Sequence, residues 1–478
     1  MFLKRFYDDG LAQASYLIGC AKTGEALVID PNRDVQQYID AAASEKLSIT
    51  HVSETHIHAD FVSGARELAQ RTGATLFLSS EGGVDWQYAF AKGDGATLVK
   101  HGDVIKVGNI KVEILHTPGH TPEHISFLIT DTAGANEPMG IATGDFVFVG
   151  DVGRPDLLEK AAKIANTMET SARTLFHSLE RFRTLPDYVQ VWPGHGAGSA
   201  CGKSLGAVPT STVGYEKRFN WGVGTTDEQT FVEMVLAGQP EPPLYFAEMK
   251  RINRDGPPIL GGFAIPTRGD LAGLTAALAS GAAVLDLRAA ADFALGHIPG
   301  TINIPLNKSF STWAGWLVKY VQPIHLIAAS ADVSHAVREL AMIGLDHAAA
   351  WYETSVVAAW TASGKPLGTI AKTDAASVAV RLAREEVTVI DVRNRTEFEA
   401  GHLPGALHIP VGHLEARLAE IPRDKPIIVQ CQSGARSAIA TSVLQRLGVT
   451  TATDLAGGFT AWEQSGFPVV RAHAAVEA

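Results

Sequence analysis

The stretch that decides the fold of the first half of the chain is Thr55-His56-Ile57-His58-Ala59-Asp60-Phe61. An apolar, β-branched run from Ile49 to Ser53 precedes it and predicts a strand, and the run from Val62 to Gln70 predicts a helix. In an extended segment every second side chain projects to the same side, so His56, His58 and Asp60 are expected to face one point. Two imidazoles and a carboxylate are a donor set for a divalent metal, whereas a helix cap needs only one oxygen.

The composition predicts a globular protein of several domains. The chain has 478 residues, 46% of them hydrophobic and 19% charged. A chain of this length is too long for a single core and predicts three domains. A formal net charge of −11 argues against binding to nucleic acid or to anionic membranes, and no apolar stretch approaches the length of a membrane span. The residues Met1 to Asp8 lack the layout of a signal peptide. Three widely separated cysteines argue against a disulfide scaffold and predict a cytoplasmic protein.

Three further strand ends carry side chains that can bind a metal. His120 follows a predicted strand within His116-Thr117-Pro118-Gly119-His120-Thr121-Pro122. Asp145 ends the run that starts at Gly140, and His195 ends the run that starts at Val189. Each lies beside glycine or proline, which fixes the direction of a turn. Four such clusters at strand ends are difficult to explain by packing alone.

In this order the four motifs resemble the metallo-β-lactamase superfamily, in particular its glyoxalase II and persulfide dioxygenase branch. The resemblance covers about residues 1–245 and implies an αβ/βα sandwich with a metal at one edge between the sheets. It implies His56, His120 and Asp145 as the metal ligands, with His58 nearby. The branch pattern is T-H-x-H-x-D-H, and Phe61 stands where the last histidine would hold a second metal. Asp60 and His195 then remain as a second-site remnant with too few ligands for a closed centre.

Two imidazoles and one carboxylate with open positions opposite are typical of non-haem Fe(II) oxygenases, so we expect one Fe(II) per chain. Open positions admit O2 and a substrate sulfur together. Arg154 matches an arginine near the iron of the dioxygenases, and it either steadies an anionic substrate or holds its loop. Cys201 lies six residues after His195. It is either an accessory sulfur-handling thiol or an inert small hydrophobe.

The C-terminal half is an internal repeat. The Asp-x-Arg run at Asp286 recurs at Asp391, and the Gly-His-x-Pro-Gly run around His297 recurs around His402, both at an offset of 105 residues. Alternating strands and helices in each copy predict α/β domains with parallel sheets. The expected domains cover residues 1–250, 260–368 and 372–472.

The second copy contains a buried strand that runs into Cys431, then a short loop and a helix from Ser437. Backbone N–H groups of such a loop and the N-terminus of the helix favour an anion and a thiolate at the sulfur. Arg436 adds a planar charged fork. The predicted anion-binding residues are Gln432, Ser433, Gly434, Ala435, Arg436 and Ser437.

Asp-x-Arg, Gly-His-x-Pro-Gly-Ala and the six-residue loop from cysteine to arginine resemble rhodanese sulfurtransferases over about residues 372–470. The resemblance implies that Cys431 carries a persulfide sulfur between donor and acceptor. In the first copy Ala328 stands opposite Cys431 and Val333 opposite Arg436, so we expect that copy to be inactive.

The whole chain resembles persulfide dioxygenase–rhodanese fusions associated with sulfide detoxification. The resemblance implies oxidation of a persulfide of glutathione, coenzyme A or a similar thiol by O2 to sulfite. Sulfur transfer through Cys431 would then give thiosulfate, or run in reverse from thiosulfate, and a homo-oligomer is expected. Two alternatives remain open: a glyoxalase II-like zinc thioester hydrolase fused to a sulfurtransferase, and a non-catalytic sulfur carrier that uses Cys431 alone.

Overall fold

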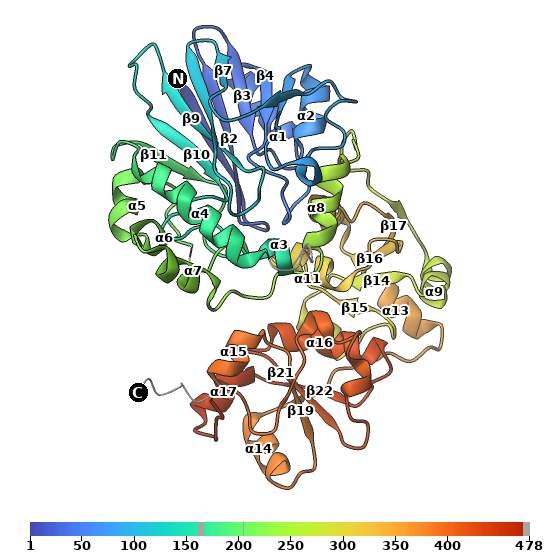
Figure 1. Cartoon of the computed structure of the whole chain (residues 1–478). Coiled ribbons are helices and arrows are strands. Elements are labelled where there is room, and N and C mark those ends of the chain that lie inside the picture. Colours follow the sequence, from blue (N-terminus) through green and yellow to red (C-terminus); the bar gives the residue numbers. More distant parts are fainter. Residues whose placement is uncertain (161–166, 204, 472–478) are drawn as a thin grey trace, which may run out of the picture. The chain divides into compact units, whose positions relative to one another are not determined.

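The computed structural model describes residues 1–160, 167–203 and 205–471 (Figure 1). The chain forms two units: Met1–Phe263 with Leu340–Gly344, and Ala264–Glu339 with Leu345–Ala478. Among the helices of the described residues, none combines the length and the apolar character that a membrane span requires.

Two six-stranded sheets build the first unit. The first has the order β1-β2-β3-β4-β5-β6, antiparallel from β1 to β3 and parallel from β3 to β6. The second has the order β12-β11-β10-β9-β8-β7, and its pairs are antiparallel except for β10 with β11. The strands are β1 (Phe2–Asp8), β2 (Gln13–Cys20), β3 (Glu25–Ile29), β4 (Ser48–Ser53), β5 (Thr75–Ser79), β6 (Thr97–Val99), β7 (Val104–Val107), β8 (Ile110–His116), β9 (Ile125–Asp131), β10 (Gly140–Gly144), β11 (Gln190–Pro193) and β12 (Ser211–Thr212).

The two sheets pack face to face and are covered by helices on their outer sides. Ile18 and Leu27 of the first sheet share one buried cluster with Val112 and Phe127 of the second. Outside the first sheet lie α1 (Gln36–Ser44) and α2 (Ala65–Thr72), and outside the second lie α4 (Met168–Arg183) and α7 (Glu228–Leu236). The remaining helices are α3 (Leu157–Lys160), α5 (Val213–Phe219), α6 (Trp221–Gly224) and α8 (Phe246–Asp255). The predicted αβ/βα sandwich is confirmed.

The helix after the histidine motif begins at Ala65, not at Val62 as the sequence predicts. The N–H group of Gly64 donates to the carbonyl of Pro31 at 2.7 Å, outside any helical ladder. A Cβ atom at Gly64 would lie 2.1 Å from the carbonyl oxygen of Asn32. A close approach between two loops therefore outweighs the local helical preference.

The second unit contains two five-stranded parallel sheets of the same strand order. We call them the first copy (β13-β17-β16-β14-β15) and the second copy (β18-β22-β21-β19-β20). The elements of the first copy are β13 (Thr267–Arg268), α9 (Leu271–Ala279), β14 (Ala283–Asp286), α10 (Ala290–Leu295), β15 (Ile302–Asn303), α11 (Phe310–Leu317), β16 (Ile324–Ala328), α12 (Val333–Met342), β17 (Ala348–Glu353) and α13 (Val356–Ala362). Those of the second are β18 (Lys372–Thr373), α14 (Ala375–Ala383), β19 (Thr388–Asp391), α15 (Arg395–Ala400), β20 (Leu407–His408), β21 (Ile427–Gln430), α16 (Ala435–Arg446), β22 (Ala452–Leu455) and α17 (Gly458–Gln464). The predicted parallel sheets are confirmed.

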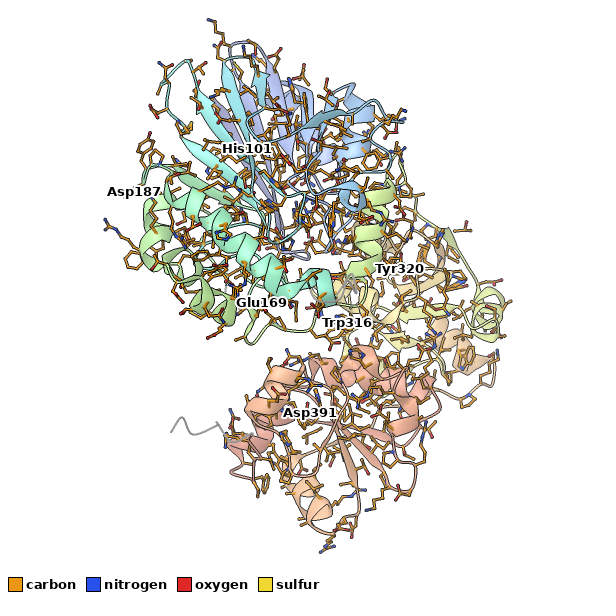
Figure 2. The ribbon with its side chains drawn as sticks, viewed as in Figure 1. His101, Glu169, Asp187, Trp316, Tyr320 and Asp391 are labelled. Atoms are coloured by element: carbon orange, nitrogen blue, oxygen red, sulfur yellow. The ribbon has the colours of Figure 1, made fainter. Side chains whose placement is uncertain are left out.

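The strand register aligns the two copies residue by residue. Asp286 pairs with Ile327 in the first copy, and Asp391 (labelled in Figure 2) pairs with Gln430 in the second. The residue that follows is Ala328 in one copy and Cys431 in the other. The first copy therefore has no thiol at the position where the second copy has one.

Candidate active sites

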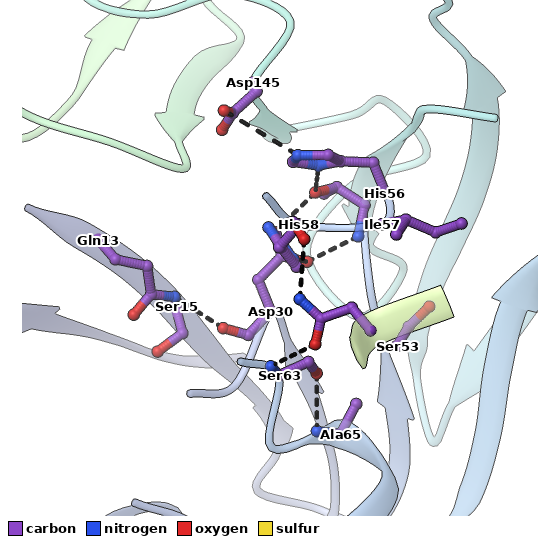
Figure 3. A network of polar contacts seen from close by, with 12 residues as sticks. Gln13, Ser15, Asp30, Ser53, His56, Ile57, His58, Ser63, Ala65 and Asp145 are labelled. Atoms are coloured by element: carbon purple, nitrogen blue, oxygen red, sulfur yellow. Dashed lines mark hydrogen bonds and ion pairs between the residues drawn. The ribbon is translucent and has the colours of Figure 1, made fainter. Parts of the chain in front are cut away.

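Three buried side chains meet at the edge between the two sheets of the first unit. His56 follows β4, His120 lies between β8 and β9, and Asp145 directly follows β10. One ligand atom from each lies within 4.8 Å of the other two. The Nε2 atoms of His120 and His56 are 3.5 and 4.0 Å from Oδ2 of Asp145, and Figure 3 shows His56 turned toward this carboxylate.

The hydrogen bonds of the two histidines leave their Nε2 lone pairs facing Asp145. Nδ1 of His120 donates to the carbonyl of Arg154 at 3.1 Å, and Nδ1 of His56 lies 2.9 Å from Oγ1 of Thr55. Backbone carbonyls and hydroxyls in this role are typical partners of metal-binding histidines.

A cation resolves the electrostatics of this cluster. Burial lowers the pKa of His56 and of His120, so both imidazoles are held neutral. Within the described part of the chain, neither carboxylate oxygen of Asp145 has a hydrogen-bond partner. Two lone pairs and a carboxylate that face each other in a dry site repel unless a positive ion lies between them. The donor set therefore fits a divalent metal with two imidazoles and one carboxylate.

A break in the sheet aims Asp145 at the site. The register of β10 against β11 shifts between Ala142 and Gly144, and Gly144 has a φ of +50°. A Cβ atom there would lie 2.5 Å from Oγ1 of Thr55, so the close packing requires glycine. The freed N–H group of Asp145 donates to Nε2 of the buried His124 at 3.1 Å. Sequence reasoning missed His124, although it follows the predicted ligand His120 by four residues.

The sequence predicts that the alternating side chains of the histidine motif converge on one point, but in the structure they do not. Nε2 of His58 lies 3.1 Å from Oδ1 of Asp30, on the other side of His56 (Figure 3). Burial opposes its charged form, but Asp30 raises the pKa of His58 to about 9. Phe61 is fully buried and its ring centre lies 4.4 Å from that of His58. Asp30 was missed by sequence reasoning, although it too is a carboxylate directly after a strand, β3.

A second cluster joins Asp60, His195 and Cys201, whose ligand atoms lie within 4.8 Å of one another. Nε2 of His195 is 3.2 Å from Asp60 and 3.4 Å from Oδ1 of Asp145, while its Nδ1 lies 2.9 Å from the carbonyl of Ala12. Burial opposes a charged imidazole, but the carboxylates raise the pKa of His195 well above its usual value. Burial also raises the pKa of the Cys201 thiol to about 12. Asp145 belongs to the first cluster and also contacts His195 of the second.

Arg154 is fully buried, and its guanidinium contacts its own loop and two others. Its guanidinium pairs with Asp156 at 2.8 Å and donates to the carbonyls of Ala200 at 2.9 Å and Pro240 at 2.5 Å. Its own carbonyl accepts from His120. Arg154 therefore links a metal-site histidine to the loop that carries Cys201.

The predicted thiol loop is formed at the end of β21. Cys431 is 1% exposed, and the N–H group of Gly434 donates to its Sγ atom at 3.1 Å. Gly434 has a φ of +109°, which turns this N–H group toward the sulfur. Oγ of Ser437 lies 3.5 Å from Sγ, and α16 begins at Ala435. The start of a helix therefore faces the thiol.

The other loop side chains are divided between solvent and neighbouring elements. Ser433 and Ala435 are exposed, and the amide of Gln432 donates to Thr460. Arg436 forms a two-pronged ion pair with Glu397 at 2.6 Å. Sequence reasoning missed the contact of Glu397 with Arg436, because the residues around Glu397 indicate only a capping box at the start of a helix.

The sequence matches two families. Residues 8–195 match the Metallo-beta-lactamase superfamily and residues 374–465 match the Rhodanese-like domain. A crystal structure described as a metallo-beta-lactamase from Staphylococcus aureus is 47% identical, covers 74% of this chain and 99% of that chain, and has a TM-score of 0.67. The chain belongs to the metallo-β-lactamase superfamily and carries a C-terminal rhodanese-like domain.

Curated relatives resemble one part of the chain each. A sulfurtransferase of Allochromatium vinosum is 38% identical over 98 residues, which are 20% of this chain and 92% of that protein. The persulfide dioxygenase ETHE1 of Bos taurus is 27% identical over 201 residues, which are 41% of this chain and 68% of that protein. A hydroxyacylglutathione hydrolase of Polaromonas is 34% identical over 38% of this chain and 61% of its own length. The chain spans about half the length of the beta-lactamase hydrolase-like proteins of Xylella fastidiosa that it also matches.

Proposed function

We propose that the first unit is an Fe(II)-dependent persulfide dioxygenase. The observation that carries the proposal is the buried cluster of His56, His120 and Asp145, in which two imidazole lone pairs face Oδ2 of a buried carboxylate. The similarity to a persulfide dioxygenase over the same part of the chain supports it. In the proposed reaction a thiol persulfide RSSH, O2 and one water give RSH, sulfite and two protons.

The residues of the chain have separate tasks in this proposal. His56, His120 and Asp145 hold one Fe(II), which when bound supplies the redox chemistry with O2 that zinc lacks. The carbonyl of Arg154 and the hydroxyl of Thr55 fix the orientation of the two imidazoles. All three ligands are buried, so charges in this site interact more strongly than they would in water.

The second copy of the repeat is proposed to transfer sulfur through Cys431. The Cys431 thiolate attacks the outer sulfur of a persulfide RSSH and the thiolate RS⁻ leaves. Sulfite then attacks this sulfur, the S–S bond to Cys431 breaks, and thiosulfate and free Cys431 are formed. The N–H group of Gly434 and the start of α16 stabilise the negative charge on the sulfur throughout. The same residues serve the reverse reaction. Glutathione or coenzyme A persulfide as substrate, a cytoplasmic location and a homo-oligomer remain predictions.

Metal content and oxygen uptake test the dioxygenase. The protein is purified without oxygen, its metals are measured, and O2 consumption is followed after glutathione persulfide is added. We expect about one iron per chain. His120→Ala should lose the iron and the O2 uptake, whereas His177→Ala, which removes a histidine that is 61% exposed on α4, should lose neither. Iron-free protein without O2 uptake would overturn the proposal.

The product distribution tests the sulfur transfer. Cys431→Ser should keep the O2 uptake and release sulfite in place of thiosulfate, because sulfite then has no sulfur donor on the protein. An unchanged thiosulfate yield would remove Cys431 from the pathway.

The second cluster favours one alternative, a zinc thioester hydrolase. Cys201 adds a third donor to Asp60 and His195, so the replacement of the last motif histidine by Phe61 does not leave that cluster with only two ligands. The similarity to a hydroxyacylglutathione hydrolase supports this alternative. It predicts two zinc ions per chain and hydrolysis of glutathione thioesters, and the metal measurement described above separates it from the dioxygenase.

A further inference from the structure

An ion pair stands at the rim of the Cys431 loop, between α15 and α16. Nη1 and Nη2 of Arg436 each donate at 2.6 Å to one carboxylate oxygen of Glu397. The two side chains are 24% and 27% exposed. Oε2 of Glu397 also accepts from the N–H group of Asn394, whose side chain in turn caps the N–H of Glu397. The carboxylate is thus held in place by its own helix and by the arginine.

This pair occupies the fork that the rhodanese resemblance assigns to an incoming anion. The second arginine beside the loop, Arg393, is also matched, because it pairs with the buried Asp391 at 2.7 Å. The charge of each arginine is therefore balanced by a carboxylate before a sulfur donor binds. The positive potential at Cys431 then comes from the N–H group of Gly434 and the start of α16. Neither Arg436 nor Arg393 adds an uncompensated guanidinium to this potential, because each is paired with a carboxylate.

Sulfur donors differ in charge at the reacting end. Thiosulfate is a dianion whose sulfonate lies next to the sulfur that is transferred, whereas a thiol persulfide carries at most one charge there. For thiosulfate to use Arg436, it must displace the carboxylate of Glu397 or bind beside it. A like charge beside an incoming anion disfavours binding.

We propose that Glu397 is a specificity-determining residue of the Cys431 site, which selects thiol persulfides over thiosulfate as sulfur donors. The inference rests on the proposed sulfur transfer by Cys431. With thiosulfate, the thiolate attacks the outer sulfur, the S–S bond of thiosulfate breaks, and sulfite leaves with the bonding electron pair. With a persulfide RSSH the same attack releases RS⁻. Both reactions leave the transferred sulfur on Cys431, so only the charge of the donor differs.

Glu397→Gln tests the proposal. Glutamine preserves the shape of the side chain and still supports the capping box, so α15 is retained. The matched control is Glu399→Gln on the same helix, where the carboxylate pairs at 3.7 Å with Arg395 and both groups are more than half exposed. Thermal unfolding of both variants checks that they fold.

Transfer is measured with cyanide as the common acceptor, which takes the sulfur from Cys431 as thiocyanate. The full chain is assayed without oxygen, so that the first unit does not consume the persulfide. Thiosulfate and glutathione persulfide are compared as donors. We expect Glu397→Gln to lower the KM for thiosulfate about tenfold and to leave the KM for persulfide within about twofold. Glu399→Gln should change neither.

A double variant identifies the source of the gain. If the freed guanidinium binds the sulfonate, Glu397→Gln combined with Arg436→Gln should return the KM for thiosulfate to the wild-type value or above. An unchanged thiosulfate KM in Glu397→Gln, or equal changes for both donors, would overturn the inference while leaving sulfur transfer intact. If the wild type transfers sulfur from neither donor, the proposed function of Cys431 fails and this inference fails with it.

Discussion

The two copies of the C-terminal repeat share a framework and differ in one loop. Each has an Asp–Arg pair at the end of the strand beside its central strand, at 2.7 Å for Asp286 with Arg288 after β14 and at 2.7 Å for Asp391 with Arg393 after β19. Each also stacks a phenylalanine on the histidine of its Gly-His motif, with ring centres 3.9 Å apart in the first copy and 3.8 Å in the second. These shared contacts maintain the sheet and its connections whether or not a thiol is present.

The loop that follows the equivalent strands separates the copies. In the second copy the loop from Cys431 passes through the left-handed Gly434 into α16, whose first turn carries Arg436. In the first copy the strand ends at Ala328, and a short 3₁₀ turn over Ser330–Asp332 leads directly into α12. The framework therefore serves the fold in both copies, and a few loop residues supply the chemistry in one of them.

The largest expected effect comes from moving the thiol between the copies. Cys431→Ser should lower sulfur transfer by about a thousandfold or more, because the nucleophile is lost. Adding Ala328→Cys to that variant should restore less than about one hundredth of the activity, since no left-handed glycine directs an N–H group at the new sulfur. Thiocyanate formation measures both. Recovery of a tenth or more would show that the framework by itself activates a thiol.

The shared Asp–Arg pairs should differ in strength. Asp391→Ala leaves Arg393, whose side chain is 2% exposed, without its carboxylate and should lower the free energy of unfolding by about 3–5 kcal/mol. Asp286→Ala should cost less, because Arg288 is 16% exposed and can be hydrated. Urea unfolding of the full chain measures the difference, with the exposed Asp424→Ala as the control. Equal losses would show that the two pairs stabilise their copies alike.

Two glycines at opposite ends of α16 separate stability from chemistry. Gly434→Ala and Gly448→Ala both force alanine into left-handed backbone, at φ values of +109° and +84°, and neither new Cβ atom would clash. Each should therefore cost about 1–2 kcal/mol of stability. Only Gly434→Ala should also slow sulfur transfer, because it moves the N–H group that contacts Cys431. Similar activity in the two variants would remove that N–H group from the chemistry.

The smallest expected effect is a dependence of stability on pH. Burial opposes the charge of Glu397, but Arg436 lowers its pKa below the usual value. The resulting stabilisation is complete above the unfolded-state pKa of about 4.3 and is lost as pH falls through the lower folded-state pKa. Because the pair is partly exposed, the effect should stay below about 1 kcal/mol. Urea unfolding between pH 3 and 7 should show a flatter acid limb for Glu397→Gln than for wild type, and identical limbs would contradict this account.

Local patterns predicted much of the architecture. The alternation of His56 and His58, the strand ends at His120 and Asp145 and the constant offset of the repeat are features of neighbouring or repeated residues. The parallel sheets followed from the alternation of strands and helices in each copy, whereas the sandwich followed from the family that the metal-ligand motifs resemble. The start of α2 at Ala65 was not predictable, because the approach of Asn32 that excludes Gly64 from the helix joins separate loops.

The side-chain partners at each site were set by the tertiary structure. The residue identities alone show which metal donors, which thiol and which arginine the chain carries, and that one copy of the repeat lacks the cysteine. Three contacts are visible only in the folded chain. His58 pairs with Asp30, and Arg436 pairs with Glu397. Cys201 lies beside Asp60 and His195. The physical reason is that periodicity encodes the direction of a side chain on its own element, whereas its partner depends on which distant element packs against it.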